Sequence, residues 1–148
     1  MLKIKDNEYE IITKKKGEEL VGLEYVPLFD YFYKENKEKG CFKVYPADYV
    51  TTEDGTGVVH NAPGFGEDDY NVGCQFKLCD PDKPVCPVDD DGCFTEEVPD
   101  YKGLNFKEAD PKIIEKLKGN GRMLFKGTIR HSYPFCYRTD TPLMYRAI

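Results

Sequence analysis

Hydrophobic residues occur in short runs along this chain, and residues that favour turns separate the runs. Short runs rich in β-branched and aromatic residues are typical of strands. The strands predicted in this way are 9–13, 19–25, 41–45, 58–60 and 122–129. Asp89–Gly92 lies between two further short apolar runs and predicts a hairpin turn.

Two stretches carry helix signals instead. Asp110 supplies a cap and Pro111 a first-turn proline, an apolar face follows, and Gly119 is a stop. The second helix is expected to begin near Gly66 and to run through Phe76. The fold class that we predict is mixed α/β and strand-rich, in one domain with peripheral helices.

Composition and charge narrow the class of protein. The chain has 148 residues, of which 40% are hydrophobic and 32% charged, as in an ordinary globular domain. Its net charge of −6 argues against a broad nucleic-acid surface, although not against binding a single nucleotide end. No apolar run reaches membrane-spanning length and the first residues lack a signal-peptide core, so we expect a soluble, cytoplasmic protein with no membrane partner.

Six cysteines raise the question of a metal site or disulfides. Cys74, Cys79, Cys86 and Cys93 are separated by four, six and six residues, and no Cys-x-x-Cys pair occurs. Structural zinc sites generally use closely spaced ligand pairs. We therefore predict no metal site, and thiols that are reduced and mostly buried.

The stretch GTGVVHNAPGFGEDDY, residues 55–70, concentrates candidate chemistry. His60 would end a short strand, Gly64 and Gly66 would allow a sharp turn, and the acids from Glu67 to Asp69 would open a helix. This order would place an imidazole and a carboxylate on opposite walls of one crevice. The alternative is structural, because acids in a first helical turn complement the helix dipole and a histidine at a strand end is often a packing residue.

The same stretch resembles the signature of the editing domain, or connective peptide 1, of isoleucyl-tRNA synthetases, which are class I aminoacyl-tRNA synthetases. Residues 58–63 together with 133–136 favour the isoleucyl over the valyl and leucyl enzymes. The resemblance is closest to the eukaryotic cytosolic type and covers nearly the whole chain. The other matching segments, in order, are 17–22, 27–32, 84–89 and 131–146.

The resemblance implies a β-barrel-like core and a hydrolytic function. The parent ligase would use ATP and magnesium to activate isoleucine, whereas the editing domain would use no cofactor. Its expected reaction is post-transfer editing, the hydrolysis of valine misattached to tRNA(Ile). Its expected partners are the 3′ end of tRNA(Ile) carrying the wrong amino acid and the synthetic domain of the same parent chain.

The resemblance also implies roles for particular residues. Asp69 matches the essential editing aspartate, which is expected to pair with the α-ammonium of the misattached amino acid. His60 matches a histidine that lines the same pocket and contributes to substrate selection and water positioning. The turn from Gly64 to Gly66 would shape the wall near the terminal adenosine. The full substrate-binding set expected is His60, Asn61, Gly64, Phe65, Gly66 and Asp69.

The chain departs from the family pattern in ways that leave two hypotheses open. A threonine-rich strand motif upstream of the signature is absent, and so are the two ATP-handling motifs. Residues 1–148 are therefore expected to be a fragment of the editing domain, in which 131–148 resemble the return segment to the synthetic domain. In that segment Cys136 is followed by Thr139 rather than by a second cysteine, which disfavours zinc. The fragment is either catalytic or a non-catalytic unit for tRNA 3′-end recognition or structure.

Overall fold

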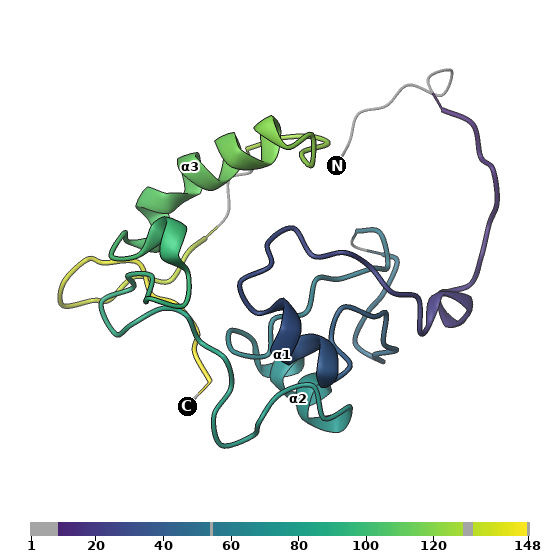
Figure 1. Cartoon of the computed structure of the whole chain (residues 1–148), viewed down its shortest axis with the longest axis horizontal. Coiled ribbons are helices and arrows are strands. Elements are labelled where there is room, and N and C mark those ends of the chain that lie inside the picture. The colour runs from purple at the N-terminus through teal and green to yellow at the C-terminus, as the bar shows by residue number, and fades with distance from the viewer. Residues whose placement is uncertain (1–8, 54, 129–131, 148) are drawn as a thin grey trace.

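Short helices are the regular elements of the computed structural model, which describes residues 9–53, 55–128 and 132–147 (Figure 1). Most of the remaining chain in these ranges forms turns and irregular segments. The elements are the 3₁₀ helices η1 (Gly17–Leu20) and η2 (Pro99–Tyr101) and the α-helices α1 (Tyr33–Glu38), α2 (Glu67–Gln75) and α3 (Phe106–Gly119).

The prediction of a strand-rich fold with a β-barrel-like core is wrong. Within the described residues, β pairing is limited to isolated antiparallel bridges, and no sheet forms. Segments 9–13, 58–60 and the described part of 122–129 take part in none of them; Ile129 lies outside the described residues. An extended segment becomes a stable strand only beside a partner that covers its backbone and one face. The bridges are Glu24–Lys43, Val88–Phe94, Cys93–Asn105 and Phe135–Pro142.

Segments 19–25 and 41–45 come closest to the predicted strands. Their backbones pair through Val44 N to Leu23 O and Tyr25 N to Phe42 O, each at 2.9 Å. The pairing stays short because η1 takes up the start of the first segment and because Phe42 adopts a left-handed φ of 66°. That conformation turns the chain out of an extended ladder.

The predicted hairpin turn at Asp89–Gly92 is confirmed. The backbone nitrogen of Asp89 donates to Cys93 O at 2.9 Å, and Thr95 N donates to Pro87 O at 2.9 Å. The Asp89 side chain accepts a hydrogen bond from Cys93 N at 2.8 Å and thereby closes the turn. Aspartate favours such positions because its short carboxylate reaches nearby backbone N–H groups.

Both predicted helices are present, but one begins earlier than expected. Helix α2 follows Gly66, as predicted. Helix α3 begins at Phe106 because Asn105 is the cap, with its side chain accepting from Lys107 N at 3.1 Å. Pro111 therefore lies inside the helix rather than in its first turn. The helix includes Gly119, which was predicted as its stop.

The main hydrophobic core lies between α3, η2 and the segment before α1. Val98, Tyr101 and Ala109 are buried at its centre. At its edge, the Tyr31 hydroxyl donates to Asp100 Oδ2 at 2.6 Å, and Lys116 of α3 forms an ion pair with the same carboxylate. The core is completed by partly buried Phe29, Tyr31, Phe32, Phe94, Leu104 and Ile113.

Helix α2 lies apart from α3 and has a smaller buried environment of its own (Figure 1). Val72 on α2 and Leu78 just after it are buried, and Phe76 packs on Tyr45 with ring centroids 4.8 Å apart. Residues 9–16 are exposed and lead into η1, away from α3 (Figure 1). Helix α2 and the loops around it are thus packed separately from the main core.

Candidate functional site

The turn before α2 brings the predicted site residues into one short unit. Phe65 N donates to Ala62 O at 2.9 Å, which closes a turn over 62–65. Gly66 follows as the N-cap of α2, and its carbonyl accepts from Tyr70 N at 2.8 Å. Because Asp69 is the third residue of α2, its side chain folds back over this turn.

The Asp69 carboxylate accepts three hydrogen bonds. The Ala62 backbone nitrogen donates to Oδ2 at 3.2 Å. The Tyr49 hydroxyl and the Asn61 side-chain nitrogen both donate to Oδ1, at 3.2 and 3.4 Å. These distances are at or beyond the long end of the usual range, so the donors orient the carboxylate without enclosing it. Asp69 is half-buried, whereas Glu67 and Asp68 are exposed.

Tyr49 is a site residue that the sequence analysis missed. It lies in a loop twenty positions before Asp69, and no helical or strand pattern includes it. Partial burial is the main cause that raises the pKa of Tyr49, and the negative charge of Asp69 adds to it. The phenol is therefore protonated at neutral pH and is a hydrogen-bond donor to the carboxylate.

His60 is not part of this hydrogen-bonded unit. Its side chain is exposed and makes no hydrogen bond or ion pair with the part of the chain that the structure describes. Its neighbour Asn61 makes the contact with Asp69 instead. The imidazole is thus exposed at the surface, one residue before Asn61 of the unit.

A side chain is excluded at Gly64 and at Gly66 for different structural reasons. Gly64 is buried, and a Cβ there would lie 2.5 Å from the Val85 carbonyl oxygen. On Gly66 a Cβ would lie 2.8 Å from Oδ2 of Asp69. The first glycine therefore permits close packing of two backbones, and the second leaves room for the carboxylate. Phe65, between them, is half-buried.

The C-terminal segment packs against the same turn. Ala147 N donates to Gly64 O at 3.0 Å, and Arg146 Nη1 lies 2.6 Å from Asp90 Oδ1 in the hairpin. His131, at the start of the predicted return segment, lies outside the described residues. The described part of that segment thus supports the side of the turn that carries Gly64.

The cysteines are all free thiols, as expected, and each is half-buried, so they are less buried than predicted. Cys74 and Cys79 lie with their sulfur atoms 3.9 Å apart. Burial is the main cause that raises the pKa of Cys79 to about 11. Within the described residues, no group of three His, Cys, Asp or Glu side chains is arranged to hold a metal ion. That the protein binds no zinc stays a prediction.

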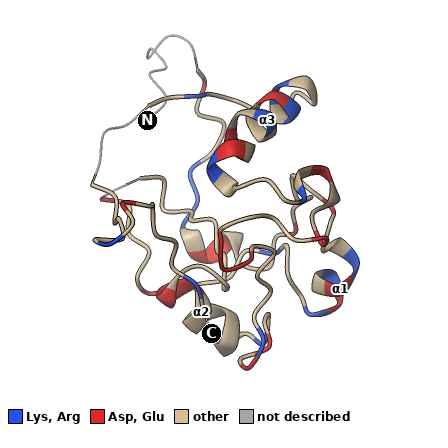
Figure 2. Ribbon diagram, turned by 90° about the vertical axis from the view of Figure 1, so that its left-hand side faces the viewer, with Lys and Arg blue, Asp and Glu red and all other residues tan. Residues whose placement is uncertain are grey.

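Charge is distributed without a broad basic face on the helices. Lys and Arg positions are interspersed with Asp and Glu along α1 and α3 (Figure 2). Helix α2 has three acids in its first turn and no basic residue in its last. In the described ranges, no helix has the length and apolar character needed to cross a bilayer.

Comparison with known proteins identifies the family. No model of a known protein family matches the chain. A relative from Bdellovibrio bacteriovorus, an isoleucine–tRNA ligase, is 54% identical over 143 residues, which is 97% of this chain. The cytoplasmic isoleucine–tRNA ligases of Mus musculus and Saccharomyces cerevisiae are 52% and 49% identical over 97% and 99% of it.

The chain belongs to the isoleucine–tRNA ligase family. It spans 13%, 11% and 14% of the length of these three relatives, so it corresponds to one segment of such a ligase. The family recognised from the residue 55–70 signature is thereby confirmed, and its members here include bacterial as well as eukaryotic cytoplasmic ligases.

Proposed function

We propose that this segment performs post-transfer editing in a cytoplasmic isoleucine–tRNA ligase, by hydrolysing valine misattached to tRNA(Ile). Isoleucine and valine differ by one methylene, which a pocket discriminates by only about 1–3 kcal/mol; the isoleucyl enzyme is itself the standard example of this limit. A second site that admits the smaller side chain and hydrolyses its ester would supply the missing selectivity. The substrate would be the aminoacylated 3′ end of tRNA(Ile).

The arrangement of Asp69 is the observation that carries this proposal. A carboxylate has about four lone-pair positions for hydrogen bonds. Three are used by Ala62, Asn61 and Tyr49, all through long bonds. Asp69 thus keeps a position for one more donor while its orientation is fixed. An α-ammonium group is the donor that fits a negative, partly solvated acceptor of this kind.

Binding the ammonium at Asp69 would position the ester for hydrolysis. Water attacks the carbonyl carbon, the bond from that carbon to the ribose oxygen breaks, and the ribose oxygen takes a proton. Valine leaves as the free amino acid and the tRNA keeps its terminal hydroxyl. Because the ester is already labile, positioning the reactants is the main contribution required of the protein.

The remaining residues have supporting roles in this proposal. His60, exposed beside the Asp69 unit, would position water and help to select the side chain. Asn61 would bind substrate in addition to holding Asp69. The turn through Gly64, Phe65 and Gly66 would form the wall near the terminal adenosine. The C-terminal segment would lead back to the synthetic domain, which activates isoleucine with ATP and magnesium, and its contacts with Gly64 and Asp90 would brace that wall.

The test is deacylation of valyl-tRNA(Ile) by the intact ligase that carries this segment. Asp69→Ala should abolish deacylation while isoleucine activation is unchanged. Asp68→Ala is the matched control, because Asp68 is the adjacent, exposed acid on the same helical turn. Normal hydrolysis by the Asp69→Ala enzyme would refute the assignment.

One observation favours a second candidate, in which the segment is a non-catalytic unit for tRNA 3′-end recognition or structure. His60 forms no hydrogen bond with Asp69, so the two residues predicted to be catalytic are not joined in one unit. On this alternative, Asp69→Ala would weaken binding of valyl-tRNA(Ile) and leave the hydrolysis rate of bound substrate unchanged. Single-turnover rates at saturating enzyme separate the two candidates.

A further inference from the structure

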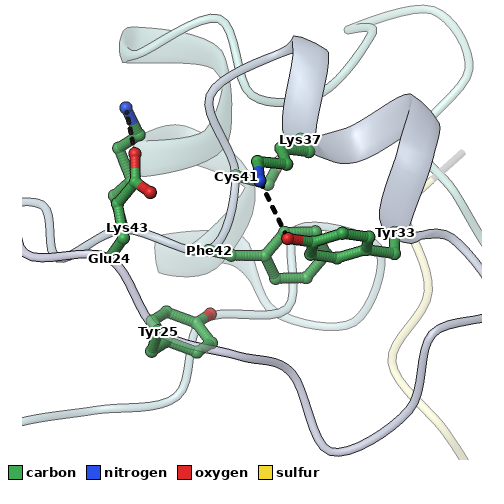
Figure 3. Close-up of a pocket in the computed structure, with 7 residues that line it drawn as sticks. All are labelled: Glu24, Tyr25, Tyr33, Lys37, Cys41, Phe42 and Lys43. Atoms are coloured by element: carbon green, nitrogen blue, oxygen red, sulfur yellow. Dashed lines mark hydrogen bonds and ion pairs between the residues drawn. The ribbon is translucent and has the colours of Figure 1, made fainter.

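A small pocket lies away from the Asp69 unit, between α1 and the two paired segments 22–25 and 41–44 (Figure 3). Its volume is about 190 Å³. Small-molecule sites usually measure roughly 300–1,000 Å³, so this pocket accommodates one ring system rather than a whole cofactor. Its lining combines three aromatic rings with two lysines, and neither the family signature nor the proposed hydrolysis gives these residues a role.

The aromatic side of the pocket is built around Phe42. The Phe42 ring lies 5.4 Å from the Tyr33 ring and 6.0 Å from the Tyr25 ring, measured between centroids. The Tyr25 ring stands edge-on to Phe42, at an interplanar angle of 89°. Tyr25 is 49% exposed, so a face of this aromatic cluster is open to solvent.

The backbone of Phe42 gives an independent indication that this ring has a role. Its φ of 66° is a left-handed conformation in which glycine and asparagine are much more common than phenylalanine. Its carbonyl accepts from Tyr25 N at 2.9 Å, so this conformation occurs within the short pairing of the two segments rather than in a free loop. Strained residues of this kind cluster at sites that bind ligands.

Two ammonium groups line the same pocket. Lys37 Nζ donates to the Tyr33 hydroxyl at 2.9 Å and lies 5.1 Å from the Tyr33 ring centroid. Lys43 Nζ lies 3.0 Å from Glu24 Oε1. Because a lysine ammonium has three donors, each lysine keeps donors for a second partner. The pocket therefore carries two positive charges and one negative charge in a chain of net charge −6.

We propose that this pocket binds one nucleotide of a single-stranded RNA segment, with the base against the Tyr25 and Phe42 rings and the phosphate near Lys37 and Lys43. Aromatic stacking combined with lysine contacts to the backbone is the usual chemistry of single-strand binding. The pocket size fits one base, and the sugar and phosphate would remain at the open rim beside the lysines. This inference concerns binding alone and stands whether or not Asp69 takes part in hydrolysis.

The experiment is photo-crosslinking of the intact ligase to a short single-stranded RNA that contains iodouridine. Crosslinked peptides are mapped by mass spectrometry. We expect adducts at Tyr25 or Phe42. Phe42→Asn keeps a residue that tolerates the left-handed backbone but removes the ring, and it should lower the Tyr25 adduct about tenfold, the scale of one base stack. Adducts confined to other segments, or an unchanged Tyr25 adduct in this variant, would overturn the proposal.

Charge variants test the phosphate contact separately. Lys37→Gln keeps a donor for the Tyr33 hydroxyl, and Lys43→Gln removes the second charge; each should weaken crosslinking and reduce its salt dependence. Lys34→Gln is the matched control, because Lys34 is an exposed lysine of the same helix that does not line the pocket. Equal losses in all three variants would contradict a specific phosphate contact.

Two further comparisons show whether the ligand is an RNA strand or a free mononucleotide, and whether it binds in this pocket or at Asp69. If an RNA strand is the ligand, the oligonucleotide should saturate the Tyr25 adduct at a lower concentration than iodouridine monophosphate does. Equal saturation would assign the pocket to a free mononucleotide and contradict the RNA assignment. Asp69→Ala should leave the Tyr25 adduct unchanged; its loss would show that the signal belongs to the Asp69 site.

Discussion

The backbone nitrogen of Ala62 donates to Oδ2 of Asp69 across 3.2 Å, and this bond joins the turn before α2 to the third residue of the helix. The position of the carboxylate is therefore set by the turn as well as by the helix. Changes to the turn are expected to act on whatever Asp69 binds, even where they leave the helix intact.

Gly66→Ala tests this dependence. The new Cβ would lie 2.8 Å from Oδ2 and 3.1 Å from Cγ of Asp69, so the carboxylate must shift, and the shift should disturb its hydrogen bond with Ala62 N. The φ of −150° at Gly66 is open to alanine, and the fold should survive with a loss of about 1 kcal/mol at the helix cap. We expect deacylation of valyl-tRNA(Ile) by the intact ligase to fall about tenfold or more, since misplacement by about 1 Å can cost far more than that.

Gly17→Ala is the control for that variant. A Cβ at Gly17 meets nothing within 4 Å, and Gly17 lies in η1 rather than near α2. Its deacylation rate should equal that of the unmodified enzyme. Equal rates in both variants would show that the turn does not set the carboxylate position.

Tyr101→Phe should stabilise the fold. The Tyr101 hydroxyl is buried and has no hydrogen-bond partner among the described residues, whereas its ring packs against Phe29 and Phe94. An unsatisfied buried hydroxyl costs about 1–3 kcal/mol, so its removal should raise the free energy of unfolding by about 1 kcal/mol. Urea unfolding of the chain measures this change.

Tyr31→Phe is the matched comparison for the same core. Its hydroxyl donates to Asp100 at 2.6 Å, so its removal should lower the free energy of unfolding. A destabilisation of similar size in Tyr101→Phe and Tyr31→Phe would mean that the Tyr101 hydroxyl has a partner in solution.

Cysteine alkylation should begin at different pH values at two positions, because the pKa values of Cys136 and Cys79 are shifted in opposite directions. A hydrogen bond from the Thr139 side chain, together with nearby backbone N–H groups, lowers the pKa of Cys136 below its usual value of 9.0. Burial raises the pKa of Cys79 to about 11. Because the thiolate is the reactive form, iodoacetamide at about pH 8 should modify Cys136 first, and Cys79 should react only as the pH approaches 11.

Peptide mapping by mass spectrometry follows both thiols in one sample. Thr139→Ala should slow the reaction of Cys136 and leave Cys79 unchanged. If Cys79 were alkylated as fast as Cys136 at the lower pH, the described environments of the two thiols would be wrong.

Local signals explain which parts of the fold could be predicted from the sequence. The start of α2 follows from a glycine cap and three acids, and the hairpin turn follows from Asp89 and Gly92. The Asp110–Pro111 pair is a strong cap signal, and it therefore predicts a start of α3 that is too late along the chain. The actual cap, Asn105, forms its hydrogen bond only two residues ahead and needs no proline.

Contacts between distant segments explain what could not be predicted. Composition predicts the strand runs, but a strand needs a partner. Among the described residues, the Glu24–Lys43 bridge alone joins two of the five predicted strands, and the Val88–Phe94 bridge joins the two short runs beside the hairpin turn. Asp69 could be selected by its place in the signature. Its donor Tyr49 and the contacts of Gly64 with Val85 and Ala147 depend on how far-apart loops meet, which no local pattern encodes.

The central claim is that Asp69 binds the α-ammonium of the substrate. The most direct test removes the negative charge from the enzyme, the positive charge from the substrate, and both together. The intact ligase and its Asp69→Asn variant are compared on valyl-tRNA(Ile) and on the analogue whose α-ammonium is replaced by a hydroxyl. A lost charge pair costs about 2–5 kcal/mol, so Asp69→Asn should slow hydrolysis of the valyl ester about 100-fold and change the hydroxyl analogue little. Equal slowing of both esters, or of neither, would contradict the claim.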